Sequence, residues 1–181
     1  MDWLDEVNEK IKRKNQILFS KDSLILQELD LFIMNQSRKA VTLWALELAE
    51  ETALLLSEKY PNEKRPYEAY KWSKMWAQGE IKMPMAKRKI LDCHALAKEL
   101  ENKEDGALCH AVGQACSVVH TVRHAMGYPI YELTSIVYRL GADNCKEAVE
   151  KRVNEYTEKL LKISENHLFD NINWADFINQ R

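Results

Sequence analysis

The stretch 105–127 reads DGALCHAVGQACSVVHTVRHAMG and is nearly free of charge. After Asp105 it contains one charged side chain, Arg123, although 30% of the residues in the chain are charged. Asp105 is a suitable residue to cap the start of a helix, and Gly127 is a suitable residue to end one. The stretch therefore predicts a single helix of about six turns.

The two faces of this predicted helix differ in chemistry but not in burial. Apolar residues recur at steps of three and four, namely Leu108, Ala111, Val112, Ala115, Val119, Val122 and Met126. The other face carries small or neutral polar residues in place of Lys and Glu: His110, Gly113, Gln114, Ser117, His120, Thr121 and His124. A helix without a charged face is typically covered on all sides. We therefore expect 105–127 to be the central helix of an all-α domain.

The rest of the chain predicts about seven further helices around that centre, in a single domain of 181 residues. They are expected at residues 2–18, 23–35, 38–59, 66–78, 84–102, 130–140 and 143–164. Ser37 and Asp143 are expected helix caps. We divide the domain into N-terminal helices (1–35), a middle region (36–131), and C-terminal helices with a tail (132–181).

Composition bears on the partners of the protein. The formal net charge is −2, which gives no electrostatic reason to expect nucleic acid or a membrane surface as partner. No apolar run approaches the length of a membrane span, and the acidic N-terminus does not resemble a signal peptide. The four cysteines form no C-x-x-C pair, which favours buried thiols in a reducing cytoplasm.

Two histidines in the predicted central helix suggest a metal site. His120 and His124 are four residues apart and would share a helix face, where they could bind a metal as a pair. His94 on the preceding helix could add a third ligand, and a Glu from residues 47–51, such as Glu47 or Glu50, a fourth. Thr121 stands where the metalloprotease motif H-E-x-x-H requires Glu, which excludes that enzyme class. Paired histidines are more often structural, so the metal site stays an alternative.

Three other features have a common structural explanation as well as a functional one. Cys116 and His120, also four apart, could form a thiolate–imidazole pair, but a thiol near an apolar stripe is usually inert. The acidic residues at positions 47, 50, 51 and 58 favour a solvated face. The tail from 167 contains several large apolar residues, so we expect it to dock on the domain or to form a homodimer interface.

Several short motifs between residues 38 and 131 resemble those of the bacterial "putative immunity protein" family, which is related to immunity-protein-5-like domains. The shared residues are W-A-x-x-x-A-E at 44–50, Arg65-Pro66 with Ala69, W-A-x-G-E at 76–80, Ala86 with Arg88, H-A-x-A-K at 94–98, G-x-A-x-x-x-x-H-x-x-x-H-A at 113–125, and Tyr131. The family often has His after the glycine, where this chain has Gln114.

The resemblance implies an all-helical, cytoplasmic protein that binds and neutralises a cognate toxin without catalysis or a cofactor. It also implies that Trp44 and Trp76 anchor the core. The motif's polar residues would form a buried network: Glu50, Arg65, His94, His120 and His124. The alternative is a small metal-binding protein or a metal-dependent hydrolase that uses the three histidines and a Glu from 47–51.

Overall fold

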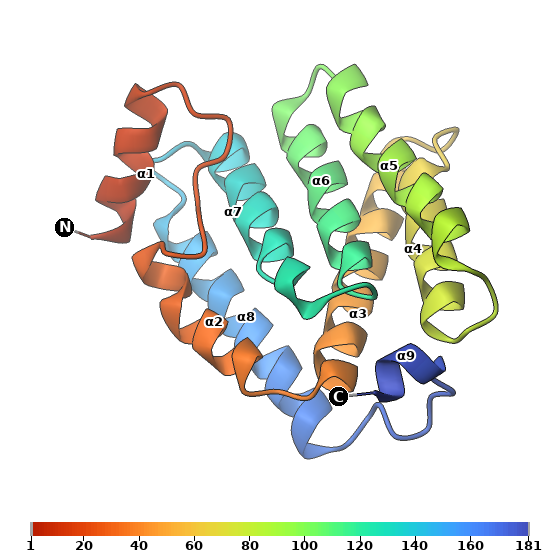
Figure 1. Ribbon diagram of the computed structural model, residues 1–181. Coiled ribbons are helices and arrows are strands. Elements are labelled where there is room, and N and C mark those ends of the chain that lie inside the picture. The colour runs from red at the N-terminus through yellow and green to blue at the C-terminus, as the bar shows by residue number, and fades with distance from the viewer. Residues whose placement is uncertain (1, 181) are drawn as a thin grey trace.

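The computed structural model describes residues 2–180 and confirms the all-α prediction (Figure 1). The described part of the chain contains nine α-helices, two 3-10 turns and no strand. The helices are α1 (Trp3–Lys12), α2 (Gln27–Met34), α3 (Arg38–Lys59), α4 (Arg65–Ala77), α5 (Met83–Glu99), α6 (Lys103–Ser117), α7 (Gly127–Leu140), α8 (Lys146–Glu165) and α9 (Asp176–Asn179), with 3-10 turns η1 (Leu24–Leu26) and η2 (Val122–His124). Within residues 2–180, no helix is both long and apolar enough to cross a membrane.

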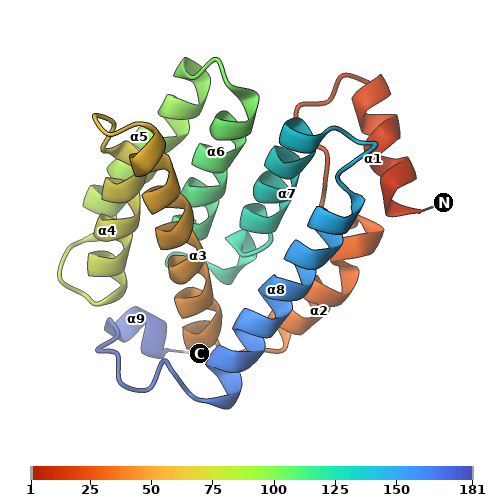
Figure 2. The ribbon, with the colours of Figure 1, turned by 180° about the vertical axis from the view of Figure 1, so that it is seen from behind.

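Helix α6 lies at the centre of one half of the molecule. It contacts α3, α4, α5 and α7, and ten of its fifteen residues are buried, which explains the lack of charge from Gly106 to its end. Figure 2 shows the other half, where α8 packs against α3, α7 and α2. Helix α3 belongs to both halves, because it contacts α4 and α6 on one side and α8 on the other.

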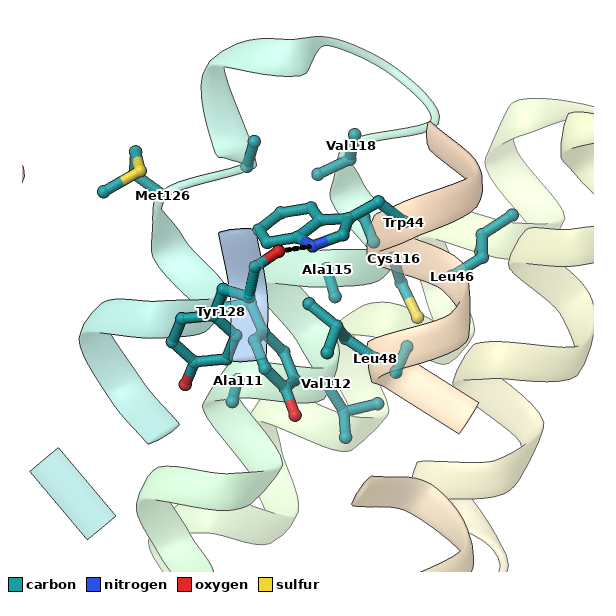
Figure 3. Packing of buried hydrophobic residues seen from close by; sticks show 14 of the residues in the cluster. Trp44, Leu46, Leu48, Ala111, Val112, Ala115, Cys116, Val118, Met126 and Tyr128 are labelled. Atoms are coloured by element: carbon teal, nitrogen blue, oxygen red, sulfur yellow. Dashed lines mark hydrogen bonds between the residues drawn. The ribbon is translucent and has the colours of Figure 1, made fainter. Parts of the chain in front are cut away.

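The core where the two halves meet is built around Trp44 of α3 (Figure 3). Its ring is fully buried, and its indole Nε1 donates a hydrogen bond to the main-chain oxygen of Tyr156, 3.1 Å away. Val112 and Ala115 of α6 and Tyr128 of α7 pack in the same core. A buried indole N–H without an acceptor would lower the stability of the fold. This bond therefore fixes α8 against α3. Trp76 is also buried.

The prediction of one helix over 105–127 is wrong in length. Helix α6 begins earlier, with Asn102 as the cap that accepts from the amide of Asp105, and it ends at Ser117. Residues 118–126 form a turn and the short η2, and Gly127 opens α7 where it was expected to end α6. His120 and His124 therefore do not share a face of one helix.

Local and tertiary bonds together explain the break after Ser117. The Ser117 hydroxyl donates to the main-chain oxygen of Gly113 at 2.8 Å, a bond that competes with the helix, and β-branched residues follow. The guanidinium of Arg38 then binds the main-chain oxygens of Val119 and His120, at 3.2 and 3.1 Å. Those oxygens would accept helical bonds in a continuous helix, so Arg38 stabilises the broken form.

Most other boundaries agree with the sequence. In the predicted helix 23–35, residues 24–26 form η1 and α2 spans only 27–34, and α7 begins three residues before its predicted start at 130. Helix α3 begins after its predicted cap, Ser37, and spans the predicted residues 38–59. The first helix stops at Lys12, whereas it was predicted to reach 18, because the backbone turns through a positive φ at Lys14. Cys145 precedes α8, where Asp143 was expected. The predicted helix 84–102 ends at Glu99.

The C-terminal tail docks on the domain, one of the two placements expected for it. The amide of Ala175 donates to the main-chain oxygen of Ala77, 2.8 Å away. The ring of Phe177 lies 5.8 Å from that of Trp76, and Ile178 is buried. The tail around Ala175 and Phe177 therefore covers the end of α4 in the same chain.

Candidate functional site

A cluster of three histidines joins α5, α6 and η2. Its members are His94, His110 and His124, with Gln114 and Tyr131 beside them; we call it the histidine cluster. His94 and His110 are linked directly, because their Nδ1 atoms lie 2.7 Å apart and one must donate to the other. The rings of His94, His110 and Tyr131 follow one another at centroid distances of 5.0 Å.

Glycine allows the close approach that forms this cluster. A Cβ atom on Gly113 would lie 2.3 Å from Nε2 of His94, so α5 can bring that ring against α6 only at a glycine. A Cβ on Gly127 would lie 2.5 Å from the side-chain oxygen of Gln114. The same oxygen accepts a hydrogen bond from Nδ1 of His124 at 3.1 Å, so Gln114 connects α6 to η2.

The histidines of the cluster are neutral at pH 7. Burial lowers the pKa of His94 to about 4, and positive charge on His110, His124 and Lys98 adds to this effect. Burial also lowers the pKa of His110, with a contribution from Lys98, and that of His124, with a contribution from His120. A neutral imidazole can be donor, acceptor or metal ligand, but it provides no fixed charge for binding an anion.

The five residues expected to form one polar network lie in several places. His94 and His124 belong to the histidine cluster. His120 is exposed, and its ring stacks on that of Trp76 at 6.3 Å. Arg65 binds Glu63 and Glu99, at 2.8 and 2.7 Å, and so ties α4 to α5.

Glu50 lies apart from the other four residues of the expected network. It lines a hollow of about 270 Å³ together with Tyr70 and Lys74. Burial raises the pKa of the Tyr70 phenol, and the carboxylate of Glu50 raises it further. Across residues 2–180, no group of three or more His, Cys, Asp or Glu side chains is arranged to hold a metal ion. The structure thus brings together two of the five predicted residues.

Sequence reasoning missed a second polar cluster, between α7 and α8. Arg152 holds Glu132 through two bonds, from Nε at 2.9 Å and from Nη2 at 3.0 Å, and Tyr156 donates its hydroxyl hydrogen to Glu132. The side chains of Arg152 and Glu132 are 19% and 13% exposed, so little water competes with the pair. We call these three residues the ion-pair seam. The available signal was that Arg152 lies three residues after Val149 and four before Tyr156, on the apolar stripe of α8.

Two acids of the α3 face that was expected to be solvated contact α8 while staying partly exposed, Glu47 at 37% and Glu51 at 48%. Lys159 binds Glu47 and Glu51, at 3.2 and 2.8 Å. A different acid, Asp105, is buried and is held by Lys59 at 2.6 Å and by the hydroxyl of Tyr60. The bond from the hydroxyl to Asp105 raises the pKa of Tyr60 to about 12. These acids are bound to cations or hydroxyls of the same chain, so they serve the packing of helices.

The cysteines are unpaired and buried, as the sequence predicted: Cys93, Cys109, Cys116 and Cys145. Burial raises the pKa of the Cys116 thiol to about 12, so it is not a thiolate at neutral pH. Because His120 is outside α6 and stacks on Trp76, the two residues do not form the thiolate–imidazole pair that helical spacing suggested.

Comparisons with known proteins identify the family but add no relative of known structure. No curated protein and no solved structure matches the chain. A family model described as "Imm-5 like putative immunity protein" matches residues 32–159, which span α3 to α7 completely and most of α8. The match includes the histidine cluster and the ion-pair seam. Since it covers most of the sequence, the chain belongs to the Imm-5-like putative immunity protein family.

Proposed function

We propose that this protein is an immunity protein that neutralises a cognate toxin by binding it in a stoichiometric complex, without catalysis. The observation that carries this proposal is the family match over residues 32–159. The chemistry of the interior supports a binding role. Among the described residues the four cysteines are buried, the buried acid Asp105 is paired with Lys59, and the histidines of the cluster bond to their neighbours.

A binder must present a rigid surface, and three links fix the helices of this protein against one another. The ion-pair seam joins α7 to α8, the Trp44 bond joins α3 to α8, and the histidine cluster joins α5, α6 and η2. Preorganisation of this kind lowers the entropy lost on association. The buried free thiols suit a reducing cytoplasm, where we place the protein.

The test is a titration of toxin activity. We take as the candidate toxin the product of the gene adjacent to that of this chain, and it is mixed with increasing amounts of the full-length protein. A stoichiometric inhibitor should abolish activity at about one protein per toxin, and the two should co-elute in size-exclusion chromatography. Full protection at a small fraction of that ratio would indicate an enzyme, and absence of both protection and complex would refute the proposal.

The metal-binding alternative, with His94, His120, His124 and a Glu from 47–51, has a separate test. The purified, tag-free protein is analysed for metals alongside a His120→Ala/His124→Ala variant. Stoichiometric metal that is lost in the variant would support the alternative. The positions described above favour a structural role, because each of the three histidines has a different aromatic or polar neighbour.

The homodimer through the C-terminal aromatics also stays a prediction. Trp174 donates its indole N–H to the main-chain oxygen of Phe169, and Phe177 packs on Trp76, so these side chains already have partners in their own chain. Light scattering of the full-length protein decides the point, since a monomer mass at high concentration would contradict a homodimer.

A further inference from the structure

One groove on the surface combines unpaired positive charge with exposed apolar side chains. It has a volume of about 780 Å³ and lies between α2, the start of α3 and the segment 118–126 that links α6 to α7 through η2. Its charged lining residues are Lys21, Arg38 and Arg123, against a single acid, Asp30. We call it the cationic groove. The groove is thus net positive, whereas the chain as a whole has a net charge of −2.

The three cations of the groove lack carboxylate partners. None of the ion pairs formed among residues 2–180 involves Lys21, Arg38 or Arg123. Arg38 bonds only to main-chain oxygens, those of Val119, His120 and Phe177. Carbonyl dipoles orient its guanidinium but do not neutralise it, so its positive charge adds to the potential of the groove.

Apolar side chains in and beside the groove are unusually exposed. Met34 at the end of α2 is 72% exposed, and Val122 of η2 is 39% exposed. Leu31, one turn before Met34 on α2, is 61% exposed. Exposed apolar groups rimmed by charge are typical of protein interaction sites, and methionine adapts its shape to a partner.

Two residues that line the groove, His120 and Arg38, are held in place by their neighbours. The ring of His120 stacks on Trp76, Trp76 packs on Phe177, and the guanidinium of Arg38 lies 5.6 Å from the centre of the Phe177 ring. Arg38 also holds the break in the chain after α6 that shapes one wall. A partner that enters the groove therefore meets a surface already in place.

We infer that the cationic groove is the docking surface for the toxin, and that it receives a segment presenting carboxylates beside apolar side chains. This inference rests on the proposed function. The cations of the groove would bind the carboxylates of the toxin segment, and Met34 and Val122 would contact its apolar side chains. A protein segment fits better than nucleic acid, because three separated cations next to aliphatic side chains do not form a basic stripe and the whole chain is acidic.

The charge test compares two double reversals in the full-length protein. Lys21→Glu/Arg123→Glu changes the groove, and both side chains are exposed and outside the ion pairs. Lys87→Glu/Arg88→Glu on α5 is the matched control, with the same change of net charge at two exposed positions. The probe is the purified toxin encoded beside the gene of this chain, and the measurement is its dissociation constant by isothermal titration calorimetry.

We expect the groove variant to bind the toxin at least about tenfold more weakly, and the control to change binding by less than about threefold. Met34→Ser should also weaken binding, whereas Met85→Ser on α5, exposed at 46%, should not. Circular dichroism melts of each variant show whether it is folded. Added salt should weaken wild-type binding more than binding by the groove variant.

The outcomes separate this inference from the proposed function. If wild-type protein binds and inhibits the toxin and the folded groove variant does so equally well, the groove is not the docking surface but the immunity function stands. If both double reversals weakened toxin binding equally, the groove would also be excluded as the docking surface, because only the net charge of the protein would then matter. Failure of the wild type to bind the toxin would overturn both. Binding of a labelled RNA oligonucleotide that is lost in the groove variant would replace the protein partner with nucleic acid.

Discussion

The ion-pair seam and the cationic groove both contain arginine, but they use it in opposite ways. In the seam, Arg152 binds both oxygens of a carboxylate that is mostly buried, and a tyrosine hydroxyl completes the bonding. In the groove, Arg38, Arg123 and Lys21 have no carboxylate within ion-pair distance among the described residues. Charges satisfied within the chain hold helices together, whereas the cations of the groove are those we propose to bind the toxin.

The histidine cluster lies between these extremes. Its polar groups bond to one another, as in the seam, but they are neutral at pH 7, since burial lowers each pKa. Protonation would turn a satisfied cluster into one with repelling charges. The three regions thus differ in how stability should respond to mutation and to pH.

The largest expected effect follows from breaking the seam. Arg152→Ala leaves the carboxylate of Glu132 mostly buried without its cation, so the free energy of unfolding should fall by about 3 kcal/mol. Chemical denaturation followed by circular dichroism measures it. The double variant Glu132→Leu/Arg152→Leu should recover much of the loss, because no unpaired charge remains. A loss below about 1 kcal/mol in the single variant would contradict a structural role for the seam.

The second effect concerns pH and the histidine cluster. The pKa of a histidine in the unfolded chain is about 6.5, whereas that of His94 in the folded protein is about 4. Between these pH values the unfolded chain binds a proton that the folded protein does not. The contribution of His94 to stability should therefore be fully present above about pH 6.5 and should fall by about 1.4 kcal/mol per pH unit as the pH drops toward about 4.

A pair of histidine variants isolates this effect. His94→Gln should flatten the pH dependence of the free energy of unfolding by about one proton. His167→Asn is the control, because His167 is exposed and Asn tolerates its positive φ. Identical pH dependence in His94→Gln and the wild type would show that His94 does not titrate as described.

The smallest expected effect on stability is in the groove. Lys21→Ala/Arg123→Ala removes two charges with no carboxylate partner, so the free energy of unfolding should change by less than about 0.5 kcal/mol. The contrast with Arg152→Ala, measured under the same denaturation conditions, is the direct test of the comparison. A loss comparable to that of Arg152→Ala would mean that the groove cations stabilise the fold.

Much of the fold could be predicted because helix signals are local. Ser37 gives the start of α3, and Pro66 and Pro84 lie in the first turns of α4 and α5. The lack of charge from Gly106 to Ser117 predicted the central place of α6, which its contacts confirm. Burial of the four thiols and the docking of the apolar tail were also readable from residue type.

The candidate site was predicted less well, because its residues depend on where one helix stops. The pairing of His120 with His124 assumed that a helix continues through 118–126, and the periodicity of Val119, Val122 and Met126 supported that assumption. Glu132 and Arg152 are twenty residues apart, so no local pattern joined them. His110 was noted on the polar face, but its partner His94 is on another helix.

The sequence by itself determined the all-α class, most helix positions, the central place of α6 and the family of the chain, because caps, prolines, apolar periodicity and motifs act over a few residues. Only the tertiary structure decided that α6 ends at Ser117, that His94 meets His110, and that Lys21, Arg38 and Arg123 share a groove. Those outcomes depend on contacts between residues far apart in the chain. The bonds from Arg38 to the oxygens of Val119 and His120 are an example, since they favour a loop where local periodicity favours a helix.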